Sequence, residues 1–191
     1  MINMTTQKNK IILGIDPGTN ILGFGIIKLE NKKIKLLELD VLLLNKIKEH
    51  DLKLKKIFEK TTFLIDNYKI DEVAIEAPFY GKNIQSMLKL GRAQGVAIIA
   101  SIQKEKKVYE YAPKKIKLAV TGSGNSSKNQ VSSMLINMLN INTKPSYFDA
   151  TDGLAVAVCH ALQNDSFPKR TTTKKTGNWS DFIKNNPNRL I

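Results

Sequence analysis

The sequence predicts an α/β domain in which helices flank a mixed sheet. Three apolar runs, at 11–16, 21–29 and 34–44, are separated by connections of only a few residues. They are therefore predicted to be antiparallel neighbours, because a parallel connection needs about a dozen residues or more. Two later apolar runs, at 71–76 and 108–111, alternate with segments of helical spacing. This alternation is typical of further strands with helices packed on the sheet faces.

Each element has a local signal in the residues. The first strand, IILGID, is ended by the turn-forming pair Pro17 and Gly18, and Asn31 begins the turn between the second and third strands. Apolar residues at helical spacing, with Lys and Glu between them, predict a helix over 50–68. The same reasoning predicts helices over 83–104, 113–120, 128–139 and 148–163.

Composition divides the chain into one domain and two ends. Residues 11–165 are expected to form the domain, residues 1–10 a disordered polar leader, and residues 166–191 a flexible basic tail rich in Pro, Thr, Lys and Asn. No apolar run approaches the roughly 18 residues of a membrane span, and the first residues lack the apolar segment of a signal peptide. We therefore expect a cytoplasmic protein with no membrane partner.

The charge balance favours a polyanionic partner. Thirty Lys and Arg against 17 Asp and Glu give 30 − 17 = +13, which favours nucleic acid before a membrane surface, although a generally Lys-rich composition also accounts for it. With 42% hydrophobic residues the chain can form a core, which excludes a disordered or fibrous protein. A single cysteine, Cys159, excludes a disulfide scaffold and a zinc site built on several cysteines.

Four carboxylates stand where chemistry is expected. Asp16 and Glu76 each end an apolar strand, while Asp149 and Asp152 are three residues apart and share one helix face. If the two strands are neighbours and the helix crosses their ends, all four converge. Carboxylates that close need a compensating charge, and a hard divalent cation such as Mg²⁺ or Mn²⁺ supplies it.

Each carboxylate also has a purely structural interpretation. Asp16 is a turn former before Pro17, and Glu76 has many lysines to pair with. Asp149 and Asp152 complement the dipole at the start of their helix. The segment GIDPGTN, 14–20, also occurs in the phosphate-binding hairpin of actin-like ATPases, but the sequence contains no second such hairpin.

Four segments in order resemble the RuvC family of bacterial Holliday junction resolvases. The resemblance runs from 11 to 162, and the two ends have no clear counterpart in the family pattern. It rests on ILGIDPGTNILGFGII (11–26), VAIEAPFYGKNIQSMLKLGRAQGVAI (73–98), YEYAPKKIKLAVTGSGNSSKNQV (109–131) and DATDGLAVAVCHA (149–161). The resemblance implies an RNase H-like fold, a homodimer that nicks four-way DNA junctions symmetrically in recombination and repair, and the branch-migration proteins RuvA and RuvB as partners.

The resemblance also implies roles for particular residues. Two Mg²⁺ ions per subunit, with Mn²⁺ as a substitute, would assist phosphodiester hydrolysis. Phe79 falls on the aromatic that contacts the junction, and Lys117 and Lys128 fall on basic positions near the scissile phosphate. The catalytic metal ligands of the family correspond to Asp16, Glu76, Asp149 and Asp152. His160 and Cys159 are expected to be structural.

Three other functions stay open at the level of the residues alone. An RNase H-type ribonuclease would keep the metal site, a non-catalytic nucleic-acid-binding module would need only the basic residues, and an actin-like ATPase fragment would use the 14–20 hairpin. The helix over 83–104 carries apolar residues on more than one side. It is expected to supply the dimer contact, with complete burial inside one subunit as the alternative.

Overall fold

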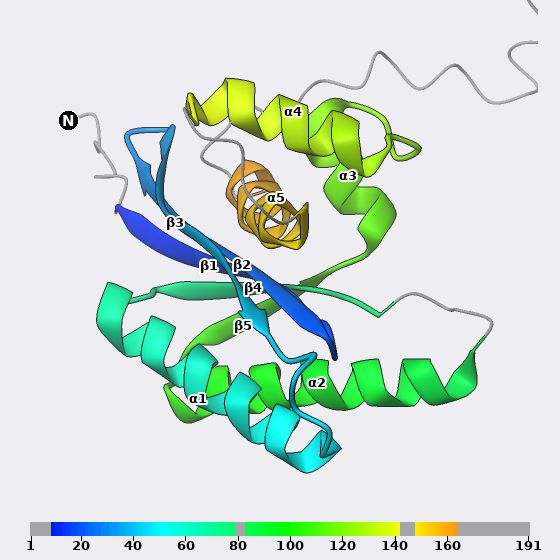
Figure 1. Cartoon of the computed structure of the whole chain (residues 1–191). Helices are drawn as coiled ribbons and strands as arrows, with labels where there is room; N and C mark the ends of the chain where they lie inside the picture. The colour runs from blue at the N-terminus through cyan, green and yellow to red at the C-terminus, as the bar shows by residue number, and fades with distance from the viewer. Residues whose placement is uncertain (1–8, 79–82, 142–147, 164–191) are drawn as a thin grey trace, which may run out of the picture.

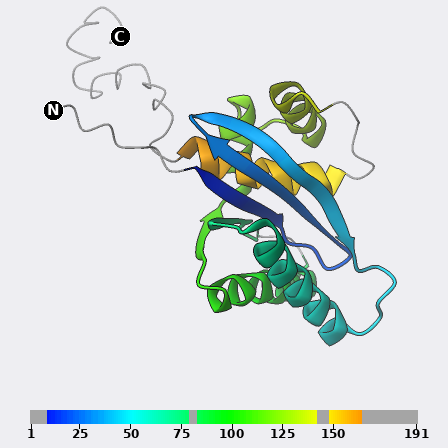
Figure 2. The ribbon, with the colours of Figure 1, turned by 90° about the vertical axis from the view of Figure 1, so that its left-hand side faces the viewer.

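The computed structural model describes residues 9–78, 83–141 and 148–163. Its five-stranded sheet has the order β3-β2-β1-β4-β5 and lies between two groups of helices, α1 and α2 on one face and α3 to α5 on the other (Figures 1 and 2). The strands are β1 Lys10–Asp16, β2 Ile21–Glu30, β3 Lys33–Leu43, β4 Glu72–Glu76 and β5 Lys107–Tyr111. The helices are α1 His50–Tyr68, α2 Ile84–Gln103, α3 Pro113–Thr121, α4 Lys128–Leu139 and α5 Phe148–Gln163.

The predicted topology is confirmed. Strands β1, β2 and β3 form an antiparallel meander, and β4 and β5 add in parallel beside β1. Element ends differ from the prediction by about one residue, and for α2 the difference arises because cap residues flank the helix. Asn83, for example, is the N-cap of α2 and accepts a hydrogen bond from the Ser86 amide at 3.0 Å.

Lys10 corrects the predicted boundary of the leader. It pairs with Leu29 as the first residue of β1, and its Nζ lies 2.6 Å from Oε1 of Glu72 on β4. Lys10 therefore belongs to the sheet, which begins one residue earlier than the apolar pattern indicated.

Helix α5 lies at the centre of one of the two cores. It packs directly on β1 and β2, with α4 on its outer side, and nearly all of its residues from Ala150 to Ala161 are buried. His160 and Cys159 are buried in this core, as expected for structural residues. The His160 ring bonds the Tyr111 hydroxyl at 2.7 Å and Glu72 at 3.0 Å, which ties α5 to β5 and β4.

Candidate active site

The end of the sheet brings two carboxylates side by side. Because β1 and β4 are parallel neighbours with Ile15 paired to Ile75, the next residues, Asp16 and Glu76, emerge at the same edge. Asp16 and Glu76 both line each of two small cavities at this edge. The convergence predicted for these strand ends is therefore present.

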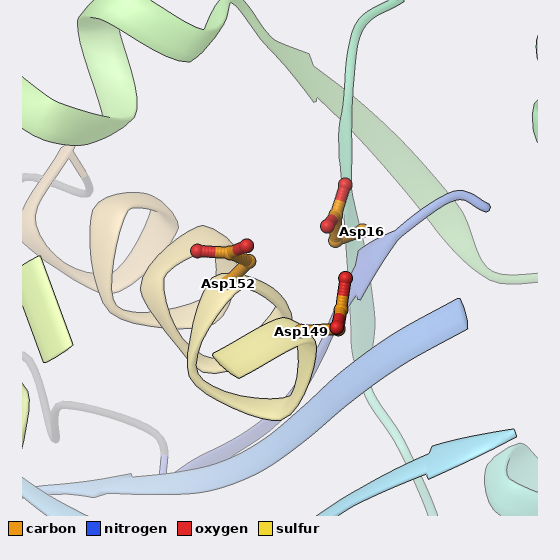
Figure 3. Close-up of side chains that lie close together, drawn as sticks. All are labelled: Asp16, Asp149 and Asp152. Carbon is orange, nitrogen blue, oxygen red and sulfur yellow. The ribbon is translucent and has the colours of Figure 1, made fainter. Parts of the chain in front are cut away.

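Helix α5 brings the other two carboxylates to this edge. Its first turns carry Asp149 and Asp152, and their side chains extend beside Asp16 (Figure 3). One oxygen from each of Asp16, Asp149 and Asp152 lies within 4.8 Å of the other two. All four predicted carboxylates are thus gathered where β1, β4 and α5 meet.

Two glycines make this close approach possible. Gly23 pairs with Asp16 across β1 and β2, and a Cβ at Gly23 would lie 1.7 Å from the carbonyl oxygen of Asp149. A Cβ at Gly153 would lie 2.5 Å from the Cα of Phe24. Helix and strand backbones therefore touch directly. The sequence argument missed these residues, although a glycine inside a strand is a signal for such close approach.

The electrostatics of the cluster are those of uncompensated negative charge. Burial, followed by the nearby Glu76 and Asp152 carboxylates, holds the pKa of Asp16 well above its ordinary value. Burial, followed by Asp152, also raises the pKa of Glu76. Burial lowers the pKa of Lys128, but the ion pair with Asp152 raises it, and the net effect is a raised pKa.

The predicted lysines share a cavity with the carboxylates. The cavity has a volume of about 120 Å³, and Lys117 from α3 and Lys128 from α4 line it together with Asp16, Glu76 and Asp152. Asp149 is outside its lining and approaches Asp16 from the β2 side. Phe79 lies outside the described residues. One small cavity is thus lined by two cations and three carboxylates.

The donor set fits a hard divalent cation. The clustered ligand atoms are carboxylate oxygens, with no His or Cys among them. Burial and the neighbouring carboxylates raise the pKa of Asp16 even though Lys128 lowers it. A cation of higher charge at this point would allow all the carboxylates to ionise together.

A mixed sheet that gathers carboxylates at the ends of two adjacent strands and on the helix crossing them defines a nuclease of the RNase H-like fold. A family model described as "Crossover junction endodeoxyribonuclease RuvC" matches residues 12–160. The chain belongs to the RuvC family. The predicted family, the fold and the function as a Holliday junction resolvase enzyme are thereby confirmed.

Relatives and solved structures agree with this assignment. The chain is 55% identical over 184 residues to a crossover junction endodeoxyribonuclease RuvC of Christiangramia forsetii, covering 96% of this chain and 94% of the relative. It is 51% identical to the same enzyme of Cytophaga hutchinsonii, covering 100% of this chain and 94% of the relative. A structure of Thermus thermophilus RuvC in complex with a Holliday junction substrate matches with a TM-score of 0.75 and 27% identity, covering 80% of this chain and 93% of that one.

The family model leaves both ends of the chain unmatched, as expected, whereas the alignment to the Cytophaga hutchinsonii relative extends over the whole chain. Within the part of the chain that the structure describes, no helix is long and apolar enough to cross a membrane.

Proposed function

We propose that this chain cuts four-way DNA junctions by metal-assisted phosphodiester hydrolysis, with Asp16, Glu76, Asp149 and Asp152 as the metal ligands. The proposed ion is Mg²⁺, two per subunit, with Mn²⁺ as a substitute. The observation that carries this proposal is the half-buried cluster in which carboxylate oxygens of Asp16, Asp149 and Asp152 lie within 4.8 Å of one another, while Glu76 lines the same cavity as Asp16 and Asp152. Once bound, such ions activate water and stabilise charge on the leaving oxygen.

Three other residues have proposed roles in contacting the DNA. Lys117 and Lys128 line the same cavity as Asp16, Glu76 and Asp152, and we propose that they neutralise a bound phosphate. The ion pair with Asp152 holds the Lys128 ammonium at the cavity wall. Phe79 follows Pro78, which stands near Glu76, and we propose that its ring stacks on bases at the branch point.

We also propose that the protein is a homodimer joined through α2. The structure shows that α2 is not wholly buried in one subunit, because Ile84, Leu88, Ile99 and Ile102 are exposed by 71, 52, 54 and 53%. Together with Gly91 and Gly95, where a Cβ would meet nothing within 4 Å, they follow one stripe opposite the buried face of the helix. A two-fold dimer built on this stripe would pair two active sites for symmetric nicks.

The dimer is tested by placing charge on the stripe. Leu88→Lys combined with Ile99→Lys is expected to yield monomers by sedimentation equilibrium, because both changes bury ammonium groups in the proposed apolar interface. The control also introduces two lysines, but on an exposed part of α1, by Leu52→Lys with Phe63→Lys. It should leave the oligomeric state unchanged. A double variant of α2 that sediments like the wild type contradicts the interface.

The remaining proposals follow from family membership. We infer that RuvA and RuvB are partners, that the protein is cytoplasmic, and that the catalytic domain extends from the start of β1 to residue 165, with 166–191 as a basic tail. Pull-down of purified RuvA and RuvB with this chain in the presence of junction DNA tests the partnership, and absence of a ternary complex contradicts it.

The metal site is tested by neutralising single ligands. Asp16→Asn and Asp152→Asn are each expected to abolish cleavage of a labelled four-way junction while junction binding persists, because the basic surface is unchanged. Asp40→Asn, on the exposed side of β3, is the matched control. Cleavage that continues in excess EDTA, or in either ligand variant, contradicts the proposal. Faster cutting of an RNA–DNA hybrid than of the junction would favour the ribonuclease alternative.

A further inference from the structure

A second cavity lies against the same two strand-end carboxylates. Asp16 and Glu76 line it, as they line the first, but its other walls come from the turn after β1, the segment after β4 and helix α2. Those walls are formed by Pro17, Ala77, Pro78, Leu90 and Gln94. The first cavity faces α3, α4 and α5 instead. The two hollows therefore flank the Asp16–Glu76 pair from opposite helical layers.

The size and lining of the second cavity suit one flat ring. Its volume is about 150 Å³, and a cavity of about that volume holds a single benzene ring. Pro17, Ala77, Pro78 and Leu90 offer apolar surface, whereas the lysines of the first cavity are absent from this lining. Among the described residues that line this cavity there is no cation, and no carboxylate beyond the shared pair, so it is less suited to a phosphate than the first cavity.

Gln94 adds a polar group of defined orientation. It is 7% exposed, and its Nε2 donates a 2.7 Å hydrogen bond to Oε2 of Glu110 on β5. That bond orients the planar amide, whose Oε1 is an acceptor suited to the N–H groups on a base edge. An apolar slot with one oriented amide is the chemistry of a nucleobase site.

We propose that this cavity binds one nucleobase of the cut strand, unstacked from the junction, while the adjoining scissile phosphate occupies the first cavity. The proposal rests on the proposed function, since the phosphate must sit at the shared carboxylates for its nucleotide to reach the slot. Bases at a branch point cost less to unstack than bases inside a duplex. Gln94 and Leu90 thus become residues that position the substrate strand.

The test combines junctions that lack one base with protein variants that alter the second cavity. Single abasic nucleotides are placed in turn on each side of the cut, and single-turnover cleavage is measured with saturating protein and Mg²⁺. Wild-type protein is expected to lose about ten- to a hundredfold in rate at one of these two positions. Gln94→Leu is expected to show a comparable loss on the intact junction but little further loss on that abasic junction.

Two more variants make the result decisive. Gln103→Leu, the same substitution on an exposed residue of α2, should leave both rates at wild-type values. Leu90→Trp fills the slot from its half-buried wall and should reproduce the Gln94→Leu pattern, which covers the case in which Gln94→Leu lowers the melting temperature.

The possible outcomes distinguish failure of the base-pocket proposal from failure of the proposed function on which it rests. Wild-type protein that ignores an abasic nucleotide on both sides of the cut overturns the base pocket but leaves the nuclease proposal intact. The proposal is also overturned if the variant loses the same factor in rate on the abasic junction as on the intact junction, because the base then binds elsewhere. Wild-type protein that fails to cut the intact junction with Mg²⁺ overturns the proposed function itself.

Discussion

Substituting Gly23 tests whether direct backbone contact between β2 and α5 sets the geometry of the active site. In Gly23→Ala the new Cβ would lie 1.7 Å from the carbonyl oxygen of Asp149 and 2.5 Å from its carbonyl carbon. Side-chain Cβ atoms essentially never come closer than 3.0 Å to such atoms, so β2 and α5 must separate by at least 3.0 − 1.7 = 1.3 Å at this point. Asp149 would retreat with α5 from Asp16, to which Gly23 is paired.

The expected cost falls on both rate and stability. A misplacement of about 1 Å in a catalytic group lowers a rate by about a hundredfold. Forcing a methyl group into a tight contact costs about 1–3 kcal/mol of unfolding free energy. We therefore expect Gly23→Ala to cut a saturating four-way junction about a hundredfold more slowly, with a lower melting temperature and weaker binding of Mn²⁺ in calorimetry.

The control is a glycine at which a Cβ would require its neighbour to shift by only a few tenths of an ångström. A Cβ at Gly124 would meet its nearest atom, the carbonyl oxygen of Lys114, at 3.3 Å. Gly124→Ala should therefore lose little stability and retain its cutting rate. The reasoning is refuted if Gly23→Ala cuts at the wild-type rate per folded molecule, whatever happens to its melting temperature.

Three further predictions follow from single side chains. Asp16→Asn should raise the melting temperature of the metal-free protein at neutral pH. Burial and the neighbouring carboxylates raise the pKa of Asp16, so the stability of the wild-type protein in EDTA falls as the pH rises from the ordinary pKa of 3.8 towards the raised pKa. The variant has no carboxyl group here and lacks this loss. Equal melting temperatures in scanning calorimetry would contradict this prediction. His160→Ala should lower the unfolding free energy by about 1–3 kcal/mol for each of the partners it abandons, Tyr111 and Glu72, and urea titration measures the change. Phe79→Ala should slow junction cleavage by up to about a hundredfold at an unchanged melting temperature, whereas a large fall in melting temperature at constant activity per folded molecule would place Phe79 in the core.

The secondary structure was predictable because its signals are local. The pair Pro17 and Gly18 ends β1, the turn at Asn31 closes the hairpin, and helical spacing marks α1. Short connections alone made the first three strands antiparallel. Errors were confined to element ends, such as Lys10, where a pairing partner far along the chain extends the strand beyond its apolar run.

The sequence by itself predicted which residues carry the chemistry. Four carboxylates at strand ends and on one helix face predicted the cluster, and the ordered motifs around them predicted the family. Only the tertiary structure decided how the cluster is held and what surrounds it. The contact of Gly23 with Asp149, the outward stripe of α2 and the slot beside Gln94 each depend on where distant segments meet in space. Periodicity and turn chemistry describe only neighbours along the chain, so they leave such distances undetermined until the helices pack on the sheet.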